Sequence, residues 1–392
     1  MRASVIELNE GTAEMVGVSV APVHGLRGGK HPDVDRWFAG CDQALTEAED
    51  MTALSGGHKI VPDYAAMALP TEITRDLPVV IEQERRHPRQ GITMDEITHL
   101  LRKGYRTAQD IVGTRQRHTT EDIICGNTAT FVVDGQAIAD PLAVEGERIE
   151  LRMRFSLAPL EWIRAMEIVA ERLQLGLTCL VPHHVLYAAP LIDPAALLIL
   201  LDEQNSTVGL ARRGRLEWTG TVPIGERDIL RATTETLVSR EQQGETLMRA
   251  YRAGQLREEI ETQVARCFWG ELRHWMTTLA RQIRSLHRGG PLPQRIYFLD
   301  LTRRIPEAYP SLETPFWEES LPFDGCPEVV ELGVGTIRNV LDCTSQAGGP
   351  PYLLLRALAH HVASMFAPGD NLDRALAEMI RWRRSSSATR SR

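Results

Sequence analysis

Histidine and cysteine are the side chains from which metal or nucleophilic chemistry is most often built. The chain has 12 histidines, and two pairs of them are adjacent, His183-His184 and His360-His361. Adjacent side chains point in different directions on a helix or strand, so neither pair is a natural bidentate metal ligand. The six cysteines are scattered, with no two at C-x-x-C spacing: Cys41, Cys125, Cys179, Cys267, Cys326 and Cys343. We therefore expect buried, reduced thiols rather than a zinc site or a disulfide framework.

The short motifs of the common enzyme classes are missing from the sequence. It contains no H-E-x-x-H, no G-x-S-x-G, no Walker G-x-x-x-x-G-K-[ST] and no G-x-G-x-x-G. Each of these motifs places a nucleophile, a metal or a phosphate where its reaction requires it. From the residues alone we assign no catalytic residue and no metal ligand.

Length and composition are those of a globular protein with two or three domains. The chain has 392 residues, of which 43% are hydrophobic and 24% charged, and its net charge is −8. The negative charge argues against nucleic acid as a partner. The densest apolar run, residues 195–201, is far shorter than the roughly 18 to 20 residues that a membrane-spanning helix needs. The first residues also lack the basic start and apolar stretch of a secretion signal, so we expect a cytoplasmic protein.

Strand and helix patterns give the elements that must position any site. Residues 4–8 and 13–20 predict two strands joined by the turn Asn9-Glu10-Gly11-Thr12. Thr93 followed by Glu96 forms a capping box, which predicts a helix start. Gly176 is expected to end a helix from residue 159 to 175. Further strands are expected at residues 78–82, 122–133, 147–155, 177–181 and 294–300, and further helices at 34–51, 93–112, 185–191, 226–287 and 350–366.

The second half of the chain begins as the first half does. An apolar strand at residues 197–201 runs into a polar turn at 202–206, and strands follow at 207–212 and 215–222. This is a weak internal repeat of a strand-turn-strand unit, which indicates two related domains.

The order of these elements, with several collinear motifs, resembles the actin-like ATPases and in particular the FtsA family of bacterial cell division. The motifs extend over about residues 3 to 300. They are QALTEAEDM at 43–51, GITMDEI at 91–97, FVVDG at 131–135, ADPLAVEGERIE at 139–150, GRL through VPIG at 214–225 and GETLMRAY at 244–251. The resemblance implies an α/β, actin-like fold of two RNase H-like domains with an inserted SHS2-type (1C) α+β subdomain. The implied parts are 1–69 and 159–196 (domain 1A), 70–158 (1C), 197–225 and 291–367 (domain 2A), 226–290 (an abbreviated helical 2B) and 368–392 (a linker and basic tail).

In this family two β-hairpins and a glycine-rich loop hold ATP and magnesium, because backbone N–H groups must approach the phosphates closely. Carried over, the ATP-binding positions are Asn9, Gly11, Thr12, Asp202, Ser206 and Thr207. Asn9 stands where the family has the aspartate that holds hydrated magnesium. Gln204, Asn205 and Ser206 replace three glycines, and residues 299–302 contain none. If those glycines had positive φ, each replacement would cost about 1–2 kcal/mol.

We therefore expect a degenerate ATPase that does not hydrolyse ATP and needs no cofactor. ATP with magnesium is the ligand its loops would hold if they bind one. In an alternative register, Gly333 and Gly335 supply the cradle.

The family resemblance also implies partners. The 2B subdomain of FtsA docks the tail of the tubulin homologue FtsZ, although here the link at residues 251–258 is short. The helix-spaced residues Phe268, Trp269, Leu272, Trp275, Met276 and Leu279 are expected in the core rather than in a peptide groove. Self-association into filaments is a further expectation.

The C-terminal tail resembles the amphipathic membrane helix with which FtsA ends. Its apolar face and basic residues would lie on an anionic membrane surface; they are Leu372, Leu376, Met379, Ile380, Trp382, Arg381, Arg383 and Arg384. Alternatively, this segment packs on the body. The sequence thus predicts a division scaffold, peripheral on the inner face of the cell membrane. The alternatives are an active actin-like ATPase and the pilus-assembly homologue PilM, which shares the 1C insertion.

Overall fold

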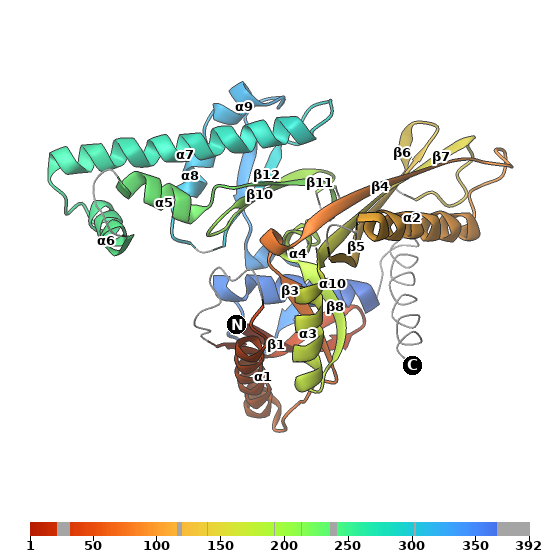
Figure 1. Ribbon diagram of the computed structural model, residues 1–392, viewed down its shortest axis with the longest axis horizontal. Helices are drawn as coiled ribbons and strands as arrows, with labels where there is room; N and C mark the ends of the chain where they lie inside the picture. The colour runs from red at the N-terminus through yellow and green to blue at the C-terminus, as the bar shows by residue number, and fades with distance from the viewer. Residues whose placement is uncertain are drawn as a thin grey trace. The chain divides into compact units, whose positions relative to one another are not determined.

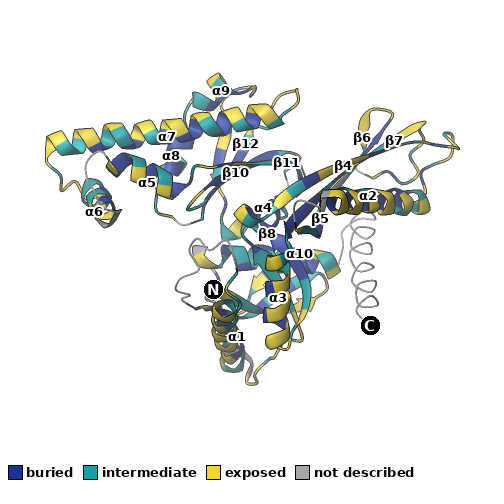
Figure 2. Ribbon diagram, in the orientation of Figure 1, coloured by how far each residue is buried: buried dark blue, intermediate teal, exposed yellow. Residues whose placement is uncertain are grey.

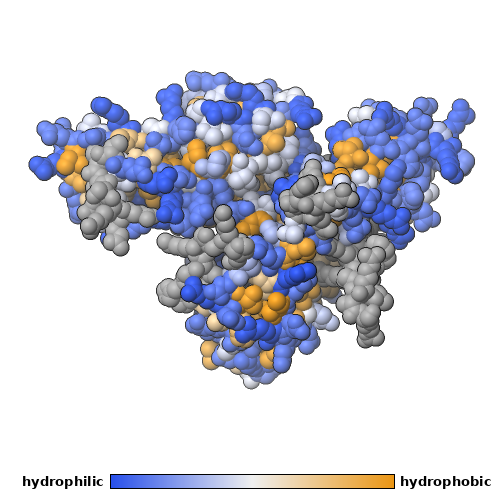
Figure 3. Space-filling model, in the orientation of Figure 1, coloured by the Kyte–Doolittle hydropathy of each residue, from blue (hydrophilic) through white to orange (hydrophobic). Residues whose placement is uncertain are grey.

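The computed structural model describes residues 1–366 except 22–31, 116–119, 139, 192, 213, 236–240 and 302. The chain divides into two compact units, drawn in Figure 1. The first contains Met1–Pro190 and the chain from Val334, and the second contains Leu191–Gly333. Figure 2 shows that helices in both units bury one side and expose the other, as expected for amphipathic helices packed on sheets. The face in Figure 3 is mainly hydrophilic, with scattered hydrophobic residues.

The first unit is built around the N-terminal hairpin. β1 (Arg2–Asn9) pairs with β2 (Thr12–Val20), and β14 (Val340–Asp342) pairs in parallel with the other edge of β2. Helix α1 (Val34–Gly56) packs on the hairpin. A Cβ on Gly17 would lie 2.0 Å from the carbonyl oxygen of Ala48, so this close packing of α1 on β2 requires glycine.

Residues 334–366 also belong to the first unit, which differs from the expected assignment of 291–367 to domain 2A. The main-chain N–H of Ala13 donates to the carbonyl of Asn339 (2.9 Å). Helix α10 (Leu353–Phe366) packs against β2 and against α4 (His183–Ala188). The chain therefore returns to the first unit after Gly333, where β14 hydrogen-bonds to the edge of β2.

A parallel pair of strands lies beside this sheet. β3 (Tyr64–Leu69) pairs with β8 (Gly176–Pro182), and α3 (Leu160–Arg172) packs on β8. A short 3₁₀ turn (Thr71–Ile73) follows β3. The expectation that Gly176 ends the helix is wrong, because Gln174 (φ 60°) provides the left-handed residue. Gly176 starts β8 instead, where a Cβ would lie 2.8 Å from Cδ1 of Tyr64.

The part of the chain that lies between β3 and α3 in the sequence forms a four-stranded antiparallel sheet. Its order is β4 (Arg75–Glu84), β7 (Arg148–Pro159), β5 (Glu121–Val133) and β6 (Gln136–Ile138). Helix α2 (Met94–Arg115) packs on this sheet, and together they bury an apolar core that includes Leu77, Ile97, Leu100, Phe131, Leu151 and Phe155. The sheet also contacts the rest of the unit, β5 with β8 and β7 with α3.

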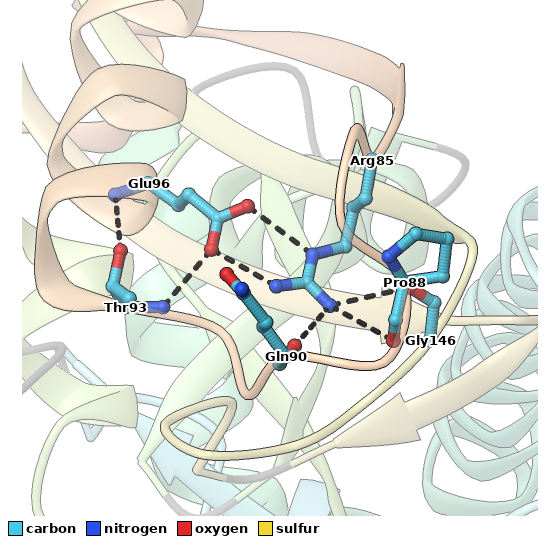
Figure 4. Close-up of polar contacts among 6 residues, drawn as sticks. All are labelled: Arg85, Pro88, Gln90, Thr93, Glu96 and Gly146. Carbon is cyan, nitrogen blue, oxygen red and sulfur yellow. Dashed lines mark hydrogen bonds and ion pairs between the residues drawn. The ribbon is translucent and has the colours of Figure 1, made fainter.

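The capping box predicted at the start of α2 is present. The Glu96 N–H donates to Oγ1 of Thr93 (3.3 Å), and the Thr93 N–H donates to Oε2 of Glu96 (3.0 Å). The same carboxylate receives two hydrogen bonds from Arg85, at 3.2 and 3.0 Å (Figure 4). The Arg85 side chain is 1% exposed, and its remaining donors reach the carbonyls of Pro88, Gln90 and Gly146.

The second unit contains a five-stranded sheet with order β11-β10-β9-β12-β13. The strands are β9 (Ala196–Leu201), β10 (Ser206–Arg212), β11 (Arg215–Val222), β12 (Arg295–Asp300) and β13 (Glu328–Glu331). β9, β10 and β11 are antiparallel, whereas β12 runs parallel to both β9 and β13. This arrangement repeats the strand-turn-strand unit that the sequence predicted.

Helices cover this sheet. The expected helical stretch at 226–287 is three helices, α5 (Glu226–Glu235), α6 (Glu241–Arg252) and the long α7 (Glu258–Leu286). α7 packs on β10 and β11, and its Trp275 contacts Phe298 of β12 edge-on. Two short helices, α8 (Ala308–Leu312) and α9 (Phe316–Ser320), also contact α7.

Candidate functional site

The expected second ATP loop is the turn that joins β9 to β10 in the second unit. The N–H of Asp202 donates to the carbonyl of Asn205 (2.9 Å), which closes a tight turn. The carbonyls of Asp202 and Glu203 accept hydrogen bonds of 2.9 Å from the N–H groups of Glu226 and Arg227. These are the first N–H groups of α5, the kind of helix terminus that can bind phosphate. Here the protein's own turn occupies them.

Ser206 and Thr207, two of the expected ATP contacts, are buried, with exposures of 0% and 3%. Oγ of Ser206 donates to the carbonyl of Ile224 (2.7 Å) and accepts from Nε1 of Trp275 (2.8 Å). The serine hydroxyl is therefore part of the core between β10 and α7.

The three residues that stand in place of the family's glycines are not strained in this turn. Gln204, Asn205 and Ser206 all have negative φ, so the penalty expected for positive φ does not apply. The close approach depends on Gly225 instead. A Cβ there would lie 2.5 Å from the backbone nitrogens of Gln204 and Asn205.

Three acidic residues lie close together at this turn: Asp202, Glu226 and Asp300. Glu226 is fully buried, and its Oε1 accepts from the N–H of Arg304 (2.9 Å). Asp300 accepts from the N–H of Arg303 (2.6 Å). Burial, and next the hydrogen bond with Asp300, raise the pKa of Glu226 to about 9. Burial also raises the pKa of Asp202. The sequence analysis named Asp202 and included position 300 in the third loop, but it gave no sign of Glu226.

The expected first ATP loop, in the first unit, is a two-residue hairpin turn. Glu10 (φ 47°) and Gly11 (φ 84°) are both left-handed, and Asn9 pairs with Thr12. This is the backbone of a type I′ turn, for which glycine at the second position is well suited. Asn9 and Glu10 are exposed, and Gly11 and Thr12 are half-buried.

The structure thus brings the six expected ATP residues together in two groups of three. Asn9, Gly11 and Thr12 lie in the first unit, and Asp202, Ser206 and Thr207 in the second. In the third loop, Leu301 donates its N–H to the carbonyl of Leu201, whereas Thr302 lies outside the described residues. Of the alternative cradle, Gly333 precedes the 3₁₀ turn Val334–Thr336 and Gly335 lies within it, both with open space where a Cβ would lie.

One histidine of each adjacent pair makes polar contacts in the structure. His184 is buried, with Nδ1 3.3 Å from Oγ1 of Thr71 and Nε2 3.4 Å from Oδ1 of Asp76. Burial lowers the pKa of His183 to about 4. Nδ1 of His360 lies 2.8 Å from the carbonyl oxygen of Arg338. Over the part of the chain that the structure describes, no cluster of three or more His, Cys, Asp or Glu residues could hold a metal ion.

None of the helices in the described ranges is both long and apolar enough to span a bilayer. The eight expected membrane-tail residues between Leu372 and Arg384 lie outside the described residues.

The arrangement of the sheets and helices is that of the actin-like ATPases. Comparison with solved structures finds the same fold in the PilM-PilN type IV pilus biogenesis complex, with a TM-score of 0.55 and 12% sequence identity. The match covers 91% of this chain and 94% of that chain. The ethanolamine utilization protein EutJ from Carboxydothermus hydrogenoformans matches less well, with a TM-score of 0.33 and 13% identity over 50% of this chain and 59% of that chain. No protein-family model and no curated protein matches the sequence. The actin-like part of the sequence prediction is confirmed, whereas the fold does not favour FtsA over PilM.

Proposed function

We propose that this chain is an actin-fold assembly protein of a bacterial envelope machine, and that it binds a partner protein as PilM binds PilN. The observation that supports this is the extent of the structural match, which covers nearly all of both chains. The sheet and helix at residues 70–158 then correspond to the 1C subdomain that the sequence resemblance implied. Fold alone does not fix function, so the identity of the partner is the point to test.

In this proposal the chain acts as a scaffold that does not hydrolyse ATP. Two contacts support this part of the proposal. The hydroxyl of Ser206 is used by Ile224 and Trp275, and the first N–H groups of α5 are used by the carbonyls of Asp202 and Glu203. A phosphate-binding loop needs such donors free and directed at the ligand.

A division scaffold of the FtsA type is the second candidate. It is favoured by the collinear motifs over about residues 3 to 300 and carries with it filament formation, FtsZ as partner and a location at the division site. The two candidates differ in partner and can be separated directly.

The test measures binding of the full-length chain to two proteins from the same genome, the PilN homologue in detergent and FtsZ. Biolayer interferometry with the immobilised chain should give saturable binding to PilN and none to FtsZ. Binding to FtsZ alone would replace the first proposal with the second, and binding to neither would reject both.

A further inference from the structure

The outer face of α7 has an unusual composition. The inner face carries the core residues, among them Phe268, Leu272, Trp275 and Leu279. Trp269 was expected with them, yet it is 46% exposed. Arg266, Arg273 and Arg281 are exposed on the same outer side, because steps of seven and eight residues are close to two helical turns. They form a row about 22 Å long.

Within the described part of the chain, these three arginines have no partner for their charge. None of their guanidinium groups makes an ion pair or hydrogen bond with any residue in the described ranges. Arg252 and Arg304 of the same unit, in contrast, pair with Glu307 and Glu245.

Acidic residues lie near the two ends of the row, and none of the exposed positions between these ends is acidic. Glu258, Glu259 and Glu261 lie in the first turn of α7, and the half-buried Glu271 is the one acidic residue later in the helix. At the far end Arg284 donates to the carbonyl of Ser320 in α9, next to the exposed Glu318 and Glu319. Between these ends the exposed positions are basic, neutral or aromatic, in a chain whose net charge is −8.

We propose that this face, defined by Arg266, Trp269, Arg273 and Arg281, docks on an anionic lipid surface. Unpaired arginines are attracted to the negative potential of such a surface. A partly exposed tryptophan suits the interface between headgroups and acyl chains. The face is one side of a single helix and therefore convex, which fits a broad surface better than a peptide, since peptides are usually held in grooves or at strand edges. The proposed contact goes beyond the proposed partner binding, and it is independent of residues 368–392.

Flotation of the full-length chain with vesicles made of equal parts phosphatidylglycerol and phosphatidylcholine tests this proposal. Wild-type protein should float with these vesicles, float much less with pure phosphatidylcholine, and be released by salt. The double variant Arg266→Glu/Arg273→Glu should lower the partition coefficient by about tenfold or more. Trp269→Ala should lower it while leaving the salt dependence unchanged. The free energies of separate membrane contacts add, so the α7 variants should lower the partition coefficient whether or not the tail also binds lipid.

The matched control is Arg102→Glu/Arg106→Glu, which reverses two exposed charges on α2. It changes net charge equally and should float like wild type. The proposal is overturned if wild type does not float, if the α7 variant floats like wild type, or if the α2 control loses as much binding. It is also overturned if soluble polyglutamate binds the α7 face as well as the vesicles do, since an acidic polypeptide would then be the better partner. Circular dichroism must show the same melting temperature for all variants, as expected for exposed positions.

Discussion

The indole N–H of Trp275 donates a hydrogen bond of 2.8 Å to Oγ of Ser206, and neither side chain is exposed to solvent. Because the same hydroxyl donates to the carbonyl of Ile224, Ser206 ties together β10, α7 and the chain before α5. The sequence resemblance implied that Ser206 would contact phosphate. Here it faces the core, which predicts that its substitution affects stability and not ligand binding.

Ser206→Ala should destabilise the protein by about 1–3 kcal/mol, because it removes the partner of the buried Trp275 N–H and of the half-buried Ile224 carbonyl. Urea unfolding followed by tryptophan fluorescence measures this. Ser285→Ala is the control, since Ser285 is exposed and its hydroxyl only bonds the carbonyl of Gln282; its effect should stay within about 0.5 kcal/mol. Equal effects of the two variants would contradict a structural role for Ser206.

The purified chain should show no ATPase activity above background and no micromolar binding of magnesium ATP. The physical reason is that the N–H groups of Glu226 and Arg227 are already bonded to the turn at Asp202 and Glu203. Isothermal titration calorimetry with ATP, with and without magnesium, is the measurement. A micromolar dissociation constant would show that the turn opens for nucleotide, and the scaffold proposal would lose its main physical argument.

Local signals in the sequence account for what could be predicted. Thr93 and Glu96 stand three residues apart, and their reciprocal hydrogen bonds form where the capping box placed them. The apolar run ending at Leu201 is the fully buried β9. Such features depend on neighbours in sequence, so a periodic pattern is enough to find them.

Contacts between distant residues account for most of what was missed. The short β14 is stable because Val340 pairs with Ala13, more than 300 residues earlier in the chain. The burial of Glu226 depends on Asp300 and Arg304, and that of Ser206 on Trp275. Family resemblance located the turn at residues 202–207, but it could not show that this turn packs on α5, because that contact requires the tertiary fold.

Glu226 predicts a pH dependence of stability. Its folded-state pKa, about 9, lies above its ordinary value of 4.5, so the folded protein binds an additional proton between these values. The free energy of unfolding should therefore decrease as pH rises through this window. Glu226→Gln replaces the protonated carboxyl with a neutral group of the same shape, and should be more stable than wild type at pH 8 with a flatter pH profile.

Urea unfolding at several pH values compares this variant with Glu235→Gln, which changes an exposed glutamate at the other end of α5. Glu235→Gln should follow the wild-type profile. Parallel profiles for wild type and Glu226→Gln would show that Glu226 is ionised in the folded protein.

The Arg85–Glu96 contact predicts a large effect in the first unit. Glu96→Ala should cost about 3–5 kcal/mol, because it leaves the buried guanidinium of Arg85 without its counter-charge. Glu82→Ala, in the strand β4 that precedes Arg85, is the matched control. Its partner Arg148 is 60% exposed and Glu82 itself 53%, so its loss should cost less than about 1 kcal/mol. Urea unfolding monitored by circular dichroism compares the two variants.

The same contact predicts the response to acid. Hydrogen bonding to Arg85 lowers the pKa of Glu96 below its ordinary 4.5. The stabilisation is then fully present above 4.5 and is lost as pH falls through the lowered value. The stability difference between wild type and Glu96→Ala should therefore shrink in acid, while the small difference for Glu82→Ala changes little. A difference that stays constant into acid would mean that Glu96 acts through packing and its cap on Thr93, and not through its charge.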